Sequence, residues 1–347
     1  MLKLFTVSGA PYELGFQLGQ KARTYIRAGA EFYRAHWKEM TGISWNLAMK
    51  LLQPSMALTA KLLPDTLAEL HGMSKGSGVP WRDMFIINSM EALEYARPKK
   101  EKCTSIIARS RGQILLAHNE DWVAKDRDFL YMVRARPNWE PEYMYFGEGA
   151  WMQTYGLNSV GIGFVADSFT ARDARRTGIS PTFLGKEIMR CSTLSAAVKR
   201  ITSLPRADGH AYVIISPDDG VVVETTATRH SLLSLQKKQY LAHTNFYQAA
   251  ALRTYEQSVR SYSRFRCLRV RELLDAKTNR VIREKELFDI LSDHENYPQS
   301  ICCHVGQEAR NPVEDQTIAS VIIDPCQLTM TVRHGNPCHA VTQKFHL

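Results

Sequence analysis

The stretch that decides the fold runs from Cys103 to Trp122 and reads CTSIIARSRGQILLAHNEDW. Its first part is rich in β-branched residues, residues 110–112 have turn chemistry, and an apolar run of strand length follows. The pattern predicts an antiparallel hairpin. Cys103 begins its first strand, and Asn119 and Asp121 lie just past the end of the second. We therefore expect a thiol, an amide and a carboxylate to converge.

A cysteine at the head of a strand has two readings. A free cysteine is most often a small buried core residue, and Cys103 could be one. Alternatively, cleavage before Cys103 would supply the base that a thiol nucleophile needs. A free α-amino group titrates at about 7.7–8.0 and a thiol at about 8.5, so the two can share a proton at neutral pH. No local signature of papain-type proteases accompanies this cysteine.

Five further segments carry a family resemblance: GAPYELG at residues 9–15, YGLNSVG at 155–161, LAHTN at 241–245, DHENYPQSIC at 293–302 and ASVIID at 319–324. With the hairpin, they make the chain resemble the peptidase C45 family over essentially its whole length. That family contains isopenicillin-N acyltransferase and β-alanyl-dopamine hydrolase, which are autoproteolytic N-terminal-nucleophile (Ntn) hydrolases. The resemblance implies an α+β fold, the four-layer α-β-β-α Ntn-hydrolase sandwich with a helical N-terminal segment.

The order of predicted elements agrees with two sheets covered by helices. Residues 1 to about 97 are expected to be helical, and strands dominate from residue 103 to about 165. The further expected elements are helices at 181–190 and 194–204, strands at 211–216, 221–226, 231–235 and 240–243, helices at about 248–275 and 284–292, and final strands at 317–323 and 328–333. Two parts follow: residues 1–102, a pro-segment that stays associated, and residues 103–347, an Ntn-hydrolase fragment with an N-terminal cysteine.

The resemblance also implies residue roles. The bond between Lys102 and Cys103 would be cut, and Cys103 would carry a substrate acyl group as a thioester. Asn245 matches the oxyanion donor, and Asp121 matches the carboxylate that orients the new α-ammonium group. Asn119 would support the same cluster through its amide, or serve only as a turn-capping side chain.

Two positions depart from the family pattern. Lys102 stands where fungal members carry glycine, and a bulky residue there is expected to slow the N→S acyl shift. Family members usually carry arginine after the segment Ser300-Ile301-Cys302, whereas this chain has Cys303 followed by His304. Ser300, Cys303 and His304 are therefore candidates for site support, with His304 as a substitute for the missing guanidinium.

Composition narrows the functional class. The chain has 347 residues, 44% hydrophobic and 23% charged, with a formal net charge of +9. Its basic residues are scattered without a nucleic-acid module, and the arginines at 260–271 have the helical spacing of a solvated face. There is no apolar stretch of membrane-spanning length and no signal peptide, so we expect a cytoplasmic protein that binds neither nucleic acid nor membrane.

The cysteines argue against a disulfide framework. Seven is an odd number, and no Cys-x-x-Cys pair occurs among them. Cys302-Cys303-His304 suggests zinc, but adjacent cysteines rarely both point into one tetrahedral site, and no second ligand pair has zinc-finger spacing. We expect no metal and no cofactor.

The leading hypothesis is therefore an autoproteolytic cysteine amidohydrolase or acyltransferase. Its partners would be a small-molecule acyl donor and, as acceptor, water, an amine or coenzyme A, and its two fragments would form a processed heterodimer. A second hypothesis is an uncleaved, inactive homologue that acts as a binding protein. A metal-dependent hydrolase built on the cysteine and histidine groups is a third.

Overall fold

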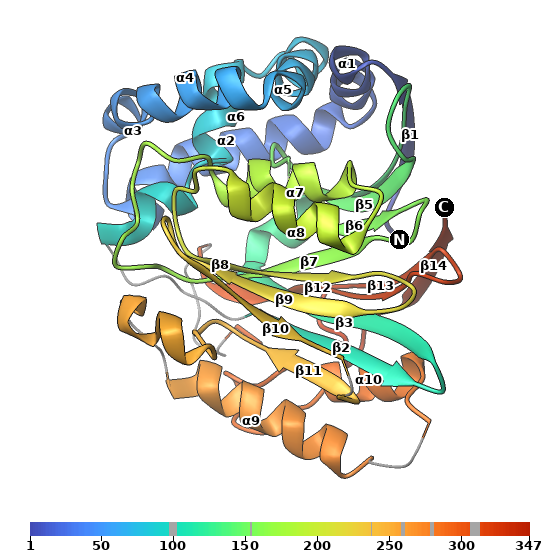
Figure 1. Cartoon of the computed structure of the whole chain (residues 1–347). Helices are drawn as coiled ribbons and strands as arrows, with labels where there is room; N and C mark the ends of the chain where they lie inside the picture. Colours follow the sequence, from blue (N-terminus) through green and yellow to red (C-terminus); the bar gives the residue numbers. More distant parts are fainter. Residues whose placement is uncertain (97–102, 153–154, 237, 258–260, 278–280, 306–312) are drawn as a thin grey trace.

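Two β-sheets form the centre of the molecule, and helices cover the outer face of each (Figure 1). The computed structural model describes residues 1–96, 103–152, 155–236, 238–257, 261–277, 281–305 and 313–347. The layers follow one another as α-β-β-α, so the predicted fold class is confirmed. Among the described helices, none combines the length and apolar character that crossing a membrane requires.

The first sheet has eight strands in the order β1-β4-β5-β6-β7-β8-β9-β10. Their bounds are β1 Leu4–Gly9, β4 Leu130–Pro137, β5 Tyr143–Glu148, β6 Gly156–Asn158, β7 Gly163–Ser168, β8 His210–Ile215, β9 Gly220–Thr225 and β10 His230–Ser234. The strands from β4 to β10 pair antiparallel, and β1 pairs parallel with β4.

The second sheet has six strands in the order β11-β2-β3-β12-β13-β14, all antiparallel. Their bounds are β11 Tyr240–His243, β2 Thr104–Ser110, β3 Gln113–Val123, β12 Asp315–Asp324, β13 Thr329–His334 and β14 Thr342–His346. The predicted hairpin is β2–β3, and its register pairs Thr104 with Asn119 and Ser110 with Gln113.

Ten α-helices make the two outer layers, as the described residues have them. Helices α1 Pro11–Lys21, α2 Arg23–Thr41, α3 Trp45–Leu51, α4 Gln53–Leu62, α5 Pro64–Ser77, α6 Trp81–Ile87, α7 Pro181–Met189 and α8 Leu194–Ser203 lie on the side of the eight-stranded sheet (Figure 1). Helices α9 Ser261–Asp275 and α10 Glu284–Leu291 cover the six-stranded sheet. Short 3₁₀ helices lie at η1 Glu91–Ala96, η2 Ala124–Phe129 and η3 Ala250–Tyr255.

The N-terminal segment is not all helical, contrary to the sequence prediction. Residues Leu4–Gly9 form β1, which pairs in register with β4 from Met132 to Pro137. A parallel partner so distant in the chain leaves no local pattern, so the short run was missed. The segment before Cys103 therefore completes the edge of the eight-stranded sheet.

The two faces of the β2–β3 hairpin enter different cores, because side chains alternate along a strand. Ile107 and Leu116 pack into the core between the two sheets. Ile106 and Ala117 pack into the second core, beneath α9 and α10. Every polar residue of the hairpin is assigned to one face or the other by this alternation.

Candidate active site

Cys103 immediately precedes β2 and is 5% exposed. Its position in the register places it opposite Glu120, on the face that looks into the space between the sheets. The thiol borders a small cavity. The residues that line this cavity are Glu91, Cys103, Glu120, Trp122, Glu148, Trp151, Tyr155 and Ser168.

A chain of buried polar groups extends from this cavity along the same face. His118 Nε2 lies 2.9 Å from Glu120 Oε2, and His118 Nδ1 lies 2.9 Å from Ser105 Oγ. The Ser105 hydroxyl donates to Asp167 Oδ1 at 2.9 Å. Both ring nitrogens of His118 are therefore engaged, so this histidine does not pair with Cys103 as a proteolytic cysteine–histidine pair would.

Asp167, on β7, carries the network to β11. Its Oδ2 lies 2.9 Å from His243 Nδ1, and His243 Nε2 lies 3.0 Å from Glu224 Oε1 on β9. Burial opposes charge on His243, but the hydrogen bonds and charges of Asp167 and Glu224 outweigh it and raise its pKa to about 9. An imidazolium held between two carboxylates thus joins the two sheets.

The electrostatic environment of Cys103 keeps its thiol protonated in the continuous chain. Burial raises the pKa of the Cys103 thiol well above its usual range, and the nearby carboxylates of Glu120, Asp121 and Asp167 raise it further. The thiol donates to Asp121 O at 3.8 Å. A backbone hydrogen bond from Asp121 lowers the pKa of the thiol, but it is the smallest of these effects. For Cys103 to act as a nucleophile, a base must lie within reach of the thiol and take its proton.

Arg266, on α9, connects Cys103 to Asn245. Its guanidinium is buried and donates to Cys103 O, to Thr104 Oγ1 at 2.6 Å and to Asn245 Oδ1 at 2.9 Å. For this residue the sequence prediction of a solvated arginine face is wrong, because α9 turns it toward the sheet. A guanidinium from α9 thus lies beside the Cys103 backbone carbonyl.

Asn245 follows β11 and is fully buried. Its amide nitrogen donates one hydrogen to Ser168 O at 2.9 Å, and Ser168 borders the Cys103 cavity. Arg266 and Ser168 together fix the Asn245 side chain, and the bond to Ser168 uses one of the two hydrogens that an amide nitrogen carries. Asn245 and Cys103 are therefore brought to one place.

Asn119 and Asp121 lie on the other face of β3, toward α10. Asn119 Nδ2 donates to Leu291 O at 2.9 Å and to Ile301 O at 2.8 Å, and its Oδ1 accepts from Ser320. These contacts make Asn119 a structural tie between β3 and the segment after α10. The predicted convergence of the Asn119 amide with the thiol is thus not observed.

The Asp121 carboxylate accepts from Thr317 Oγ1 at 2.5 Å. Its charge nevertheless acts on the Cys103 thiol, since it contributes to the raised pKa. Asp121 therefore acts on Cys103 in two ways. Its backbone carbonyl accepts a hydrogen bond from the thiol, and its carboxylate charge raises the pKa of the thiol.

The three candidates for site support lie in the segment after α10, which contacts β12 at Thr317. Ser300 Oγ donates to Cys302 O, and the Cys303 backbone N–H donates to Thr317 Oγ1 at 2.9 Å. Cys303 thus reaches Asp121 through one shared hydroxyl. His304 Nε2 points instead to Cys302 and His294. Lys102 lies outside the described residues.

Two groups of side chains in the described residues have the composition of metal sites. In the first, ligand atoms of Cys103, His118 and Glu120 lie within 4.8 Å of one another. The hydrogen bonds of His118 account for that arrangement without an ion. The second group consists of His294, Cys302, His304 and Cys338. A larger cavity of about 570 Å³, lined by Lys238, Tyr240 and Arg271 among others, lies at the far end of β2.

Comparison with known proteins assigns the family. Residues 108–339, more than half of the chain, match the family described as Acyl-coenzyme A:6-aminopenicillanic acid acyl-transferase. The chain therefore belongs to this family of acyl-transferring enzymes, the C45 family that the motifs indicate. No curated protein matches the chain.

Two solved structures are similar at low identity. Penicillin V acylase from Agrobacterium tumefaciens is 13% identical with a TM-score of 0.48, over 71% of this chain and 86% of the other. A variant of conjugated bile acid hydrolase from Clostridium perfringens is 15% identical with a TM-score of 0.46, over 71% of this chain and 97% of the other. At these values the family match, and not these structures, assigns the chain.

Proposed function

We propose that the protein is a cysteine Ntn amidohydrolase or acyltransferase that becomes active when the Lys102–Cys103 bond is cut. The observation that carries this proposal is the Cys103 thiol, which heads a strand, faces a cavity and is held protonated by burial and carboxylates. A new α-amine on the same residue would be a base within reach of the thiol. The same carboxylates that disfavour a thiolate would stabilise the ammonium formed when the amine takes its proton.

In the processing step, the Cys103 thiol attacks the carbonyl carbon of Lys102, the peptide nitrogen leaves as the α-amine, and water hydrolyses the resulting thioester. In turnover, the amine takes the thiol proton as sulfur attacks the substrate acyl carbon. Asn245 Nδ2 donates to the developing oxyanion, and the leaving group takes the proton from the ammonium. Water or an amine acceptor then releases the acyl group. Such a preorganised donor typically lowers the barrier by about 3 kcal/mol.

The fragment before the cut would remain docked. It contributes β1 to a sheet, and its buried side chains bond across to the rest of the chain. Lys186 Nζ lies 2.7 Å from Glu69 Oε1, and Asn88 Nδ2 donates to Ala150 O at 2.9 Å. Trp122 Nε1 donates to Tyr33 OH at 2.6 Å beside the cavity. Loss of the N-terminal fragment would expose a sheet edge and would break the buried ion pair between Glu69 and Lys186. Both changes are strongly unfavourable.

The test is a comparison of wild type with Cys103→Ala and with Cys267→Ala, a second buried cysteine on α9. Wild type and Cys267→Ala should give two bands under denaturing conditions, residues 1–102 and 103–347, which co-purify when native. Cys103→Ala should stay whole. A screen of N-acyl amino acids, β-alanyl amines and acyl thioesters, read by intact mass, should add an acyl group to the long fragment only where Cys103 is present.

Four results would contradict the proposal. Active wild type that is entirely full-length would refute cleavage, and cutting of Cys103→Ala would assign the cut to an external protease. A soluble, fully active long fragment without residues 1–102 would refute the docked segment. Cleaved protein that forms no adduct with any donor would favour the second hypothesis, a binding protein on the same fold.

A further inference from the structure

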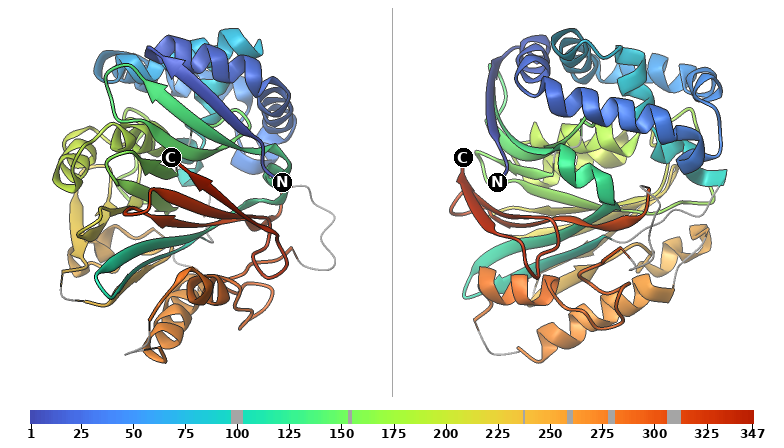
Figure 2. Two further views of the ribbon diagram at one scale, coloured as in Figure 1. Left: turned by 90° about the vertical axis from the view of Figure 1, so that its right-hand side faces the viewer. Right: turned by 180° about the vertical axis from the view of Figure 1, so that it is seen from behind.

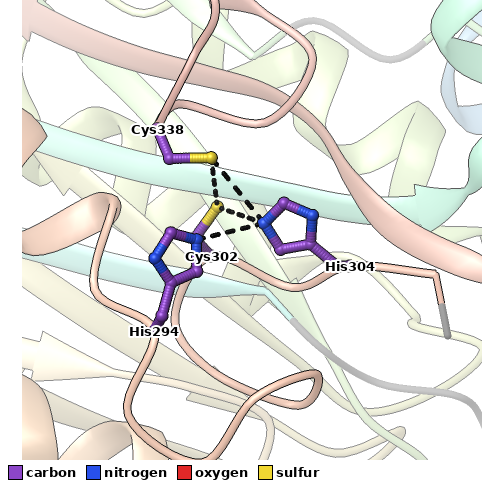
Figure 3. Close-up of side chains that lie close together, drawn as sticks. All are labelled: His294, Cys302, His304 and Cys338. Carbon is purple, nitrogen blue, oxygen red and sulfur yellow. Dashed lines mark hydrogen bonds between the residues drawn. The ribbon is translucent and has the colours of Figure 1, made fainter. Parts of the chain in front are cut away.

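We propose that His294, Cys302, His304 and Cys338 bind one zinc ion in a tetrahedral site separate from the Cys103 cavity. Figure 3 shows the four side chains pointing toward one another. His294, Cys302 and His304 belong to the segment after α10, and Cys338 belongs to the turn between β13 and β14. One ligand atom from each lies within 4.8 Å of all the others.

Four of the six separations between ligand atoms are close to those of tetrahedral zinc, and the other two are within 4.8 Å. With Zn–S near ~2.3 Å and Zn–N near ~2.05 Å, a tetrahedron sets two sulfurs ~3.8 Å apart, sulfur and nitrogen ~3.6 Å, and two nitrogens ~3.3 Å. Cys302 Sγ and Cys338 Sγ lie 3.7 Å apart. His304 Nε2 lies 3.3 Å from Cys302 Sγ, 3.7 Å from Cys338 Sγ and 3.1 Å from His294 Nε2.

The donor set also suits zinc in charge and in kind. Two thiols that give up their protons to solvent, with two neutral imidazoles, make a neutral complex with Zn²⁺, which suits a half-buried place. Mixed sulfur and nitrogen ligands in a tetrahedron select zinc over the hard cations Mg²⁺ and Ca²⁺. Cys302 is buried whereas His294 and Cys338 are exposed, so an ion can enter from solvent.

Outer groups hold the ligands in place. His339 Nδ1 lies 3.1 Å from Cys338 Sγ. Asn336 Nδ2 donates to Cys303 O at 2.7 Å and lies 3.7 Å from Cys302 Sγ. Donors around metal-bound sulfur typically contribute about 10–100-fold to affinity.

Four protein ligands close the coordination sphere, so the ion would be structural and not catalytic. It would fasten the segment after α10 to the β13–β14 turn. Asn119 of β3 bonds Ile301 O in that same segment, which adjoins Cys302. The ion would thereby stiffen the outer support of the hairpin that begins at Cys103.

The sequence argument against zinc assumed that Cys302 and Cys303 act together. In the structure Cys302 joins the cluster, while Cys303 Sγ lies 3.9 Å from His304 O. The remaining ligands, at positions 294, 304 and 338, have no zinc-finger spacing, so no motif marks them.

The experiment is elemental analysis of the full-length chain, purified without a histidine tag or chelator. We expect roughly one zinc per chain in wild type. The zinc content should fall at least about tenfold in His294→Ala and in Cys338→Ser. Both side chains are exposed, and circular dichroism would verify that the two variants fold. Cys326→Ser, an exposed cysteine outside the cluster, should keep the ion. X-ray absorption should report two sulfur and two nitrogen neighbours.

Three outcomes would overturn the proposal. One is wild type that lacks zinc as purified and does not take it up on titration with zinc chloride. Another is equal zinc in wild type and in the folded His294 and Cys338 variants, which would mark adventitious metal. The third is a Cys302–Cys338 disulfide in freshly isolated protein, detected by mass before and after reduction.

Discussion

The site at Cys103 and the cluster at Cys302 and Cys338 both contain sulfur, but different groups surround the sulfur in each. The Cys103 thiol faces the space between the sheets, where its charged neighbours are the carboxylates of Glu120, Asp121 and Asp167. Cys302 and Cys338 are surrounded by imidazoles in loops at the edge of the second sheet. A carboxylate repels a thiolate, so Cys103 stays a thiol until a base is supplied, whereas two thiolates and two imidazoles attract a divalent cation.

The contrast shows that a cysteine's chemistry is decided by the charge of its partners more than by its exposure. Cys302 and Cys103 are both buried, yet of the two only Cys302 lies beside a second sulfur, at 3.7 Å. The structure therefore supports two independent proposals, one for acyl transfer and one for a metal. Four further measurements would separate them.

Asn245→Ala should have the largest effect, confined to the Cys103 site. Loss of the proposed oxyanion donor should lower turnover by about 10²–10³-fold, with much less change in substrate affinity. Steady-state kinetics with any donor found in the acyl screen would measure both. Zinc content should not change. A loss of affinity with unchanged turnover would instead make Asn245 a substrate-binding residue.

His243→Gln should come next, through pH-dependent stability. The folded pKa of about 9 exceeds the unfolded value near 6.5, so His243 stabilises the fold fully below about pH 6.5. As pH rises to about 9 this contribution, about 3 kcal/mol, is lost. Urea unfolding of uncut Cys103→Ala protein at several pH values, with and without His243→Gln, would measure it. If the free energy of unfolding changed with pH in the same way in both proteins, a charged His243 would not be the source of the pH dependence.

Alkylation would compare the two sulfur sites directly. Bound zinc should slow the reaction of Cys338 with iodoacetamide, and a chelator should speed it by about tenfold or more. Cys326, also exposed, serves as the internal control, since its rate should not respond to the chelator. Peptide mapping by mass spectrometry would follow both cysteines. A chelator-independent Cys338 rate would contradict the metal proposal.

Asp121→Asn should have the smallest effect, a shift in the pH profile. Removing this carboxylate would lower the pKa of the proposed α-ammonium, so the acidic limb of activity should move down by up to about one pH unit. Thr317→Val keeps the Asp121 charge and removes the hydroxyl that donates to Asp121 and accepts from the Cys303 backbone N–H, so its profile should not move. An unshifted Asp121→Asn profile would argue against this electrostatic role.

The local part of the fold could be predicted from sequence. The β2–β3 hairpin follows from alternation and turn chemistry, and α7 and α8 lie close to their predicted ranges. The sequence does not reveal the edge strand β1, because it is short and its sheet position depends on the distant strand β4. It does not reveal β14 either, because this short strand is largely exposed and has no apolar alternation, although it pairs with the neighbouring β13.

The site could be predicted only in part. Cys103 and Asn245 come together as the motifs suggest, through Arg266, whose burial depends on how α9 packs. The two-residue turn predicts on which face of the hairpin Asn119 and Asp121 lie. It pairs Ser110 with Gln113, so Cys103 comes opposite Glu120, and the neighbouring residues Asn119 and Asp121 point to the other face. The charged network across the two sheets is tertiary, and no spacing in the chain signals it.

The two ends of the chain suggest a way to bypass autoprocessing. They lie on the same side of the molecule (Figure 1), and the segments next to them are in contact, since the Leu2 backbone N–H donates to Gln343 Oε1 at 2.7 Å. Figure 2 shows the gap that a linker between the two ends would span. A short linker from Leu347 to Met1 would close the chain, and a gene permuted to open at Cys103 would encode Met-Cys as its first two residues. Removal of that initiator methionine would give the free α-amine at once. Such a protein would carry the nucleophile with no cut, whatever residue stands in place of Lys102.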